Sequence, residues 1–384
     1  MQDLLTLFTE QLPEAVALLG EMVSMESPSY DKELTDRFVE FLAGKFQEIG
    51  GDVDIVPAAK VGNHLRVKFS DASSHRVLLL GHTDTVWTAG EIAKRPFKIE
   101  NRRATGPGVF DMKAGILLMW MAMRVLKARP LTILLNSDEE IGSSSSRSLI
   151  ESEASQCGAV LVLEPSLPGG ALKTARKGVG RFTVKAIGRA AHAGIDPGKG
   201  VNAVEEISRQ ILKLQQMTDS TRNTTVTVGV VQGGTRPNVV PAEAAAEIDV
   251  RIASIDEAGR IAAMIKALSP ELPGARLEIR GGINRPPMER NTETDRLFGA
   301  AREIAAEFGL DLKEGSTGGA SDGNFTSAIG IPTLDGLGAV GGGAHAIDEW
   351  IEIDSLPQRA ALLAGLIRYC SGGVGSQPPS GEKV

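Results

Sequence analysis

The sequence predicts an α/β protein: a larger domain on a mostly parallel sheet, with a smaller α+β domain inserted into it. Over the first 165 residues, short runs rich in Val, Leu and Ile alternate with helical patterns. This alternation is typical of a parallel sheet buried on both faces. The pattern changes near Gly178 and returns after Gly281, which indicates an inserted domain.

The first part of the chain carries the elements of the larger domain. In the segment 31–49, Leu34, Phe38, Leu42 and Phe46 recur at helical spacing, and Gly50 stands where a C-terminal cap belongs. The other predicted helices cover 13–25, 113–128 and 143–154, and the predicted strands cover 63–69, 76–80, 131–136 and 158–163.

The middle of the chain shows a β-α-β-β-α-β order. Its predicted strands cover 181–188, 224–231, 244–253 and 275–280, and its helices cover 201–214 and 256–268. A further helix is expected at 293–308. We therefore expect a first segment of the larger domain at 1–177, an inserted lid-like domain at 178–284, a second segment at 285–372 and a disordered polar tail at 373–384.

The bulk properties exclude several classes of protein. A chain of 384 residues favours two domains, and its net charge of −7 argues against nucleic acid as a partner. Apolar runs such as 116–125 are too short to span a membrane, and the acidic start lacks the basic region of a signal peptide. We therefore expect a cytoplasmic protein, in which the distant Cys157 and Cys370 are buried free thiols.

Five motifs place acids and histidines where apolar runs end: GHTDTV, GVFDMKAG, NSDEEIGS, LVLEPS and GGAHAIDEW. In α/β proteins such residues can meet at one edge of the sheet. Imidazole and carboxylate groups without thiolates suit zinc in a catalytic site. The sequence therefore predicts a metal centre formed by His82, Asp111, Glu140, Glu164 and His345.

Each of these residues taken alone also has a purely structural interpretation. His82 and Asp84 point the same way on an extended chain, so one can bind metal while the other supports it. They could equally be a strand-end histidine and a turn cap. Asp111 could cap a helix, Glu164 could be a turn residue, and His345 could belong to a linker.

The Glu139–Glu140 pair carries the strongest local signal. Adjacent acids are unfavourable unless a cation or a functional proton separates their roles. One would bind metal while its neighbour takes a proton from water as general base. A solvated acidic turn is the alternative. His64 and His75 lack acidic partners in the sequence and are expected at the surface.

Together the motifs resemble the dinuclear zinc amidohydrolases, the family of glutamate carboxypeptidase, aminoacylase and succinyl-diaminopimelate desuccinylase. The resemblance implies a zinc-exopeptidase-like catalytic domain with two Zn²⁺ per subunit, Co²⁺ or Mn²⁺ being alternatives. It also implies a cis peptide between Asp111 and Met112. The implied roles are His82 and Glu164 on one zinc, Glu140 and His345 on the other, Asp111 as the bridge, Glu139 as general base and Asp84 as the acid supporting His82.

The inserted domain adds matches to the same family. The segment GRAAHAG implies that His192 stabilises an oxyanion, usually in the active site of the partner subunit, and hence a homodimer formed through this domain. GGTRPNVVP implies that Asn238 contacts substrate. EIDVR implies that Arg251 binds a substrate carboxylate, although a surface strand residue is the alternative. STGGASDGNF implies that Gly318 and Gly319 line the substrate pocket.

With Glu164 rather than an aspartate at this position, the chain resembles the carboxypeptidase, aminoacylase and desuccinylase branches of the family more than the tripeptidase branch. The missing Asp-Gly turn in IENRRATGPG is a departure that we interpret as loop variation. The resemblance to glutamate carboxypeptidase implies hydrolysis of an amide bond beside a free carboxylate. The substrate would be a small peptide or N-acyl amino acid that releases C-terminal glutamate. An N-acyl-amino-acid deacylase or desuccinylase shares every metal motif, whereas a non-catalytic metal-holding protein has no need of Glu139.

Overall fold

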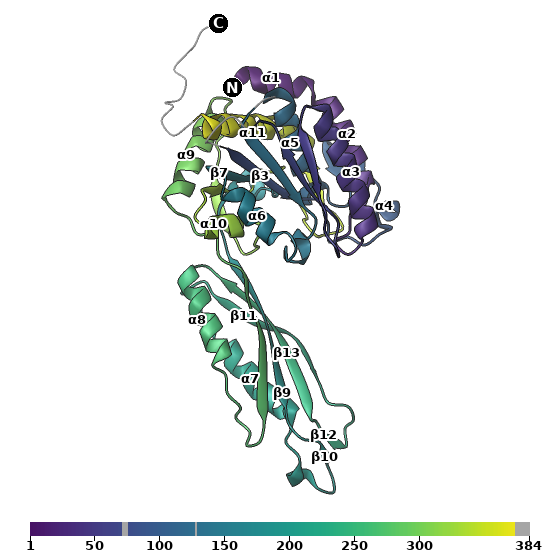
Figure 1. Cartoon of the computed structure of the whole chain (residues 1–384), viewed down its shortest axis with the longest axis vertical. Coiled ribbons are helices and arrows are strands. Elements are labelled where there is room, and N and C mark those ends of the chain that lie inside the picture. Colours follow the sequence, from purple (N-terminus) through teal and green to yellow (C-terminus); the bar gives the residue numbers. More distant parts are fainter. Residues whose placement is uncertain (71–75, 127–128, 373–384) are drawn as a thin grey trace. The chain divides into compact units, whose positions relative to one another are not determined.

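A computed structural model describes residues 1–70, 76–126 and 129–372, and the chain forms two compact units (Figure 1). The first unit contains the described residues of Met1–Thr174, Arg290–Ser316 and 321–372. The second unit contains Ala175–Glu289 and Thr317–Ala320. The tail predicted at 373–384 and His75 lie outside the described residues.

The first unit is built on a six-stranded sheet with the order β1-β2-β6-β3-β7-β16. Strands β6, β3, β7 and β16 run parallel, whereas β2 runs antiparallel to both β1 and β6. The predicted α/β class with a mostly parallel sheet is therefore confirmed. The strand bounds are β1 Asp52–Val56, β2 His64–Lys68, β3 Val77–His82, β6 Leu131–Asn136, β7 Ala159–Val162 and β16 Thr333–Leu334.

Helices cover both faces of this sheet (Figure 1). Successive strand residues point to opposite faces, so Leu79 belongs to the core formed with α5 (Ala114–Leu126) and α11 (Leu356–Ser371). Its neighbour Leu80 belongs to the core formed with α6 (Arg147–Ala154) and α10 (Gly323–Ala328). The other helices of this unit are α1 Gln2–Glu10, α2 Leu12–Ser24, α3 Lys32–Glu48, α4 Glu91–Lys94 and α9 Thr292–Ala306.

Most predicted helices of the first unit are present, with shifted ends. The helix predicted at 143–154 begins only at Arg147, because residues 144–146 form turns. Gly50 follows α3 with a φ of 90°, as expected of a C-terminal cap. Our sequence reasoning missed α1 and α11. Most of α11 is buried, which leaves little amphipathic contrast to detect.

The second unit has the predicted β-α-β-β-α-β order. Its four-stranded antiparallel sheet has the order β11-β13-β9-β14, and one hydrophobic core joins it to two helices. A separate strand pair, β10 Ala191–His192 with β12 Val239–Val240, is also antiparallel. The remaining bounds are β9 Gly178–Ile187, α7 Ala203–Gln215, β11 Thr225–Gly233, β13 Glu243–Ile252, α8 Ile255–Lys266 and β14 Arg276–Arg285.

A small antiparallel sheet in the first unit holds the loop that carries His345. Its order is β17-β18-β5-β4, and residues 343–349 connect β17 to β18. The bounds are β4 Lys98–Glu100, β5 Arg103–Thr105, β17 Gly341–Gly342 and β18 Trp350–Glu352. A further strand pair consists of β8 Leu172–Arg176 and β15 Glu314–Thr317.

The two cysteines are free, as predicted. Cys157 is buried and Cys370 is half-buried. Burial raises the pKa of each thiol to about 12, so neither is a reactive thiolate at neutral pH.

Candidate metal centre

Three parallel strands deliver acids and a histidine to one edge of the large sheet. Strand β3 lies between β6 and β7, so the carboxyl ends of all three strands lie together. His82 is the last residue of β3. Glu139 and Glu140 occupy the 3₁₀ turn after β6, and Glu164 follows the end of β7. The sheet topology therefore explains why residues from distant stretches meet.

Asp111 lies in the turn Val109–Lys113, just before α5. The Asp111–Met112 peptide is cis, as the family resemblance implied. One carboxylate oxygen of Asp111, Oδ1, lies 3.3 Å from His82 Nε2. The other, Oδ2, lies 3.3 Å from His345 Nε2. Asp111 thus stands between the two histidines, with one oxygen for each.

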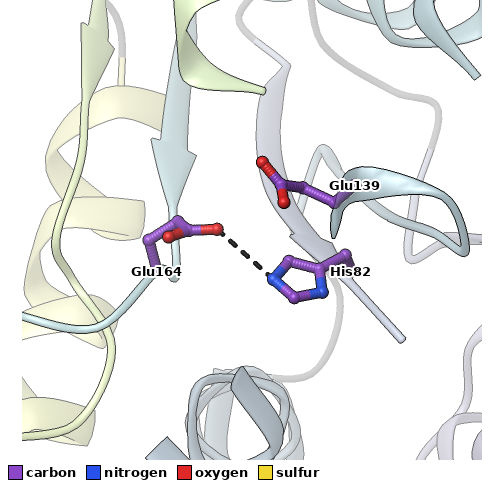
Figure 2. A group of neighbouring side chains, drawn as sticks. All are labelled: His82, Glu139 and Glu164. Atoms are coloured by element: carbon purple, nitrogen blue, oxygen red, sulfur yellow. Dashed lines mark ion pairs between the residues drawn. The ribbon is translucent and has the colours of Figure 1, made fainter. Parts of the chain in front are cut away.

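Two groups of possible ligand atoms form around this carboxylate. One contains His82, Asp111 and Glu140, and the other contains His82, Glu139 and Glu164; within each, the ligand atoms lie within 4.8 Å of one another. Figure 2 shows the second group, in which His82 Nε2 lies 3.4 Å from Glu164 Oε1. His345 Nε2 lies 3.1 Å from Glu140 Oε2. The structure therefore brings together all five residues expected to bind metal.

One end of the cluster is buried and the other is open. His82, Glu139 and Glu164 are buried, whereas 51% of the His345 side chain is exposed. His345 adopts a left-handed backbone conformation, with a φ of 63°. Solvent or a substrate can therefore approach the cluster beside His345.

Asp84 supports the cluster in two ways. Its main-chain oxygen lies 2.9 Å from His82 Nδ1, so a proton on Nδ1 directs the Nε2 lone pair toward the carboxylates. Its buried carboxylate accepts hydrogen bonds from the backbone N–H groups of Glu139, at 3.1 Å, and Glu140, at 3.2 Å. Ser29 Oγ donates a third hydrogen bond to that carboxylate, at 2.7 Å. Asp84 therefore fixes the turn that carries both glutamates.

The electrostatics of the cluster favour positive charge between the carboxylates. Hydrogen bonds that His345 donates to the carboxylates of Asp111 and Glu140 raise its pKa to about 11. Burial disfavours charged His82, but hydrogen bonds with Asp111, Asp84 and Glu164 outweigh it and raise its pKa well above 6.5. Burial raises the pKa of Glu140 to about 7. Two histidine nitrogens among buried carboxylates are a donor set that fits divalent cations of the zinc type.

Glu349 is a site residue that our sequence reasoning missed. Its side chain is buried, and Oε1 accepts hydrogen bonds from the backbone N–H groups of Phe110, at 2.8 Å, and Asp111, at 2.9 Å. Its Oε2 accepts from Gly108 N–H, at 2.9 Å, and from Trp87 Nε1–H, at 3.2 Å. One carboxylate therefore links the His345 loop to the turn that carries Asp111. The acid inside the GGAHAIDEW motif was the available signal.

The prediction that His64 lies at the surface is wrong. His64 is buried at the start of β2, and its Nδ1 accepts a hydrogen bond from Ser137 N–H at 3.2 Å. Its Nε2 lies 3.3 Å from Ser145 Oγ, and that hydroxyl donates to buried Asp138 at 2.8 Å. The ring thus packs behind the segment that carries the two glutamates. Burial lowers its pKa, although Asp138 opposes the shift.

The remaining predicted site residues belong to the second unit. His192 is exposed, and its Nδ1 accepts hydrogen bonds from the N–H groups of Gly194 and Ile195, each at 3.1 Å. A neutral ring therefore carries its proton on Nε2. Asn238 precedes β12, and its carbonyl accepts from Ala193 N–H at 3.0 Å, so it lies next to the His192 strand.

Arg251 lies on β13 and is already paired. Its Nε and Nη2 donate to the two carboxylate oxygens of Asp249, at 2.8 and 3.0 Å, and its Nη1 donates to Gly318 O at 3.4 Å. Gly319 O accepts from Arg176 Nη1 at 3.2 Å. The carbonyls of Gly318 and Gly319 thus contact arginines of their own unit.

Comparison with known proteins relates this fold and site to a family. Residues 78–369 match the model of peptidase family M20/M25/M40. Carboxypeptidase G2 of Pseudomonas sp. (strain RS-16) is 30% identical over 372 residues, covering 94% of this chain and 90% of its own. Acetylornithine deacetylase of Salmonella heidelberg (strain SL476) is 26% identical over 265 residues, which cover 62% of this chain and 68% of the deacetylase. The crystal structure of a tripeptidase from Staphylococcus aureus has a TM-score of 0.75 at 21% identity. The match covers 94% of this chain and 99% of the tripeptidase chain.

The α/β fold and the cluster of histidines and carboxylates define a hydrolase of the metallopeptidase and amidohydrolase class. The chain belongs to peptidase family M20/M25/M40. Among the described residues, none of the helices is long and apolar enough to cross a membrane.

Proposed function

We propose that the protein is a dinuclear zinc hydrolase that cleaves an amide bond next to a free carboxylate and releases a C-terminal amino acid, glutamate. The position of Asp111, with Oδ1 toward His82 and Oδ2 toward His345, carries this proposal. A carboxylate with one oxygen on each side suits a bridge between two cations. His82 and Glu164 would hold one zinc, and Glu140 and His345 the other.

The chain's own residues would supply proton transfer and positioning. Bound zinc would polarise the scissile carbonyl and make water a better nucleophile. Glu139 lies beside the ligands and is buried, so it can take the proton of the attacking water and pass it to the leaving amine. Asp84 holds the backbone of Glu139 during this transfer. The geometry alone would also allow Glu139 to bind metal, and the family resemblance favours the base role.

The second unit would contribute substrate contacts. The Nε2–H of His192 points away from the backbone that occupies Nδ1, so it is available to donate to an oxyanion. Asn238 would contact the substrate beside it. Arg251 would bind the substrate carboxylate through the Nη groups, sharing the guanidinium with Asp249.

Two relatives support two substrate classes. The similarity to carboxypeptidase G2 over nearly the whole chain favours release of a C-terminal amino acid, and the motif resemblance to glutamate carboxypeptidase favours glutamate. The shorter similarity to acetylornithine deacetylase favours the alternative, an N-acyl-amino-acid deacylase or desuccinylase-like activity. Both would use the same metal cluster, so only the substrate distinguishes them.

A substrate panel tests the proposed activity. The zinc-loaded protein would be assayed with folyl-type glutamates, N-acetyl amino acids and N-succinyl-diaminopimelate. We expect the glutamate conjugates to give the highest kcat/KM. If an N-acetyl or N-succinyl substrate turns over while no glutamate conjugate does, the glutamate assignment is wrong. If nothing turns over with zinc, Co²⁺ or Mn²⁺, the hydrolase proposal itself fails for these substrates.

The variant Glu139→Gln tests the general base. It should keep its bound metal and lose turnover by about 10²–10⁴-fold. Glu48→Gln, at the exposed end of α3, removes the same charge and should leave turnover unchanged. Loss of metal in Glu139→Gln would instead make Glu139 a ligand.

We also propose a homodimer through the second unit, in which His192 serves the site of the partner. Mixing His192→Ala subunits with Glu139→Gln subunits should then restore part of the activity. A protein that is active as a strict monomer would contradict this arrangement.

A further inference from the structure

The first unit contains a pocket of about 450 Å³ on the small sheet β17-β18-β5-β4, and none of the metal-cluster residues lines it. Four of its lining residues are basic and one, Asp348, is acidic. We propose that this pocket binds the oxyanion group of a small molecule, a carboxylate or a phosphate. The basic residues are Lys94, Arg95, Lys98 and Arg103.

Strand register places three lining residues side by side. Lys98 of β4 is paired with Thr105 of β5, and Thr105 is paired with Trp350 of β18. Paired residues of neighbouring strands project from the same face of a sheet. Arg103 lies two residues before Thr105 and shares that face. An ammonium group, a hydroxyl and a guanidinium group are therefore presented on one surface.

The two cations on this surface are not ion-paired within the described residues, although strand register places exposed Glu100 and Glu352 opposite Arg103. Lys94 and Arg95 both pair with Glu91, at 3.2 and 2.9 Å. Neither Lys98 nor Arg103 forms an ion pair with any acid of the described chain. The whole chain has a net charge of −7, so the positive charge at this pocket is local and does not reflect the overall composition. A bound anion would relieve the repulsion between these cations.

Stacking on Trp350 holds the Arg103 guanidinium in an orientation that suits an oxyanion. Its guanidinium carbon lies 3.8 Å from the centre of the Trp350 ring. A guanidinium group stacked on an aromatic ring keeps its N–H edges for hydrogen bonds, which match the two oxygens of a carboxylate or phosphate. A pocket of this volume falls in the range of small-molecule sites, so we infer a small ligand.

The pocket also contacts the loop that carries His345. Ile347 and Asp348 line it, and Arg95 Nη1 donates to Ile347 O at 3.0 Å. Arg95 is held in place by stacking on Trp87, 3.9 Å from the ring centre. A bound anion would therefore join the segment 94–98 to the loop 343–349.

Binding of inorganic phosphate and of glutarate to the zinc-loaded protein tests the proposal. Isothermal titration calorimetry at constant ionic strength would compare the wild type with Lys98→Gln/Arg103→Gln. The control Arg37→Gln/Lys313→Gln removes two exposed cations far from the pocket in sequence. We expect saturable binding of one probe, weakened at least about tenfold by the pocket variant and unchanged in the control.

The two probes separate the sources of the oxyanion. Tighter binding of phosphate assigns a phosphorylated ligand, and tighter binding of glutarate assigns a carboxylate. The single variant Lys98→Gln, which leaves the Arg103–Trp350 stack intact, should also weaken binding and decides the test if the double variant does not fold. Two results would overturn the proposal: no saturable binding of either probe, or equal binding by wild type and pocket variants, which would locate the anion elsewhere.

Discussion

Replacing Glu349 by glutamine tests how the metal cluster is held in place. The carboxylate of Glu349 accepts four hydrogen bonds, three of them from the backbone at Gly108, Phe110 and Asp111. Glutamine keeps one acceptor oxygen and turns an NH₂ group toward two of the four donors. Each buried donor without an acceptor costs about 1–3 kcal/mol, so the free energy of unfolding should fall by about 2–6 kcal/mol.

The same change should weaken metal binding. Whichever two donors lose their acceptor, the turn that carries Asp111 loses backbone support, and removal of such outer partners typically lowers metal affinity by about 10–100-fold. The assays are urea unfolding of the metal-free protein and competition for zinc with a chromogenic chelator. The control is Glu352→Gln, which removes an exposed glutamate from the same small sheet. Wild-type stability together with wild-type zinc affinity in Glu349→Gln would refute the role given to this residue.

Two further predictions concern the groups behind the cluster. Asp84→Asn places an amide against the N–H groups of Glu139 and Glu140, which then lose their charged acceptor. Zinc affinity should therefore fall by about 10–100-fold in the chelator assay. The control Asp52→Asn changes an exposed residue and should leave zinc affinity unchanged. His64 has a lowered pKa in the folded protein, so the unfolded chain takes up its proton first and stability falls as pH drops below about 6.5. His64→Asn should make the urea midpoint less sensitive to pH between about 7.5 and 5.5, and an unchanged slope would argue against this contribution.

The metal-site residues could be predicted from the sequence where each one stands at the end of a strand that the sequence also predicts. His82, Glu140 and Glu164 each stand at or after the end of a hydrophobic strand, and parallel pairing brings those ends to one edge. His345 stands in a loop between two very short strands, so only its motif indicated it. The strands 131–136 and 158–163 were found because both are buried on both faces.

Residues whose environment depends on distant partners were not predictable in the same way. Glu349 acts on backbone groups about 240 positions earlier in the chain, and its local sequence shows only an acid beside a tryptophan. His64 has no acid nearby in sequence, yet the fold buries it against Ser137 and Ser145. Strand β1 was missed because most of its residues are exposed, which leaves no hydrophobic run.

The central claim is that two metal ions share Asp111, and anomalous X-ray diffraction from zinc-loaded crystals tests it most directly. Two zinc peaks are predicted, one beside His82 and Glu164 and the other beside Glu140 and His345, with the Asp111 carboxylate between them. A single peak, or zinc bound away from Asp111, would contradict the account.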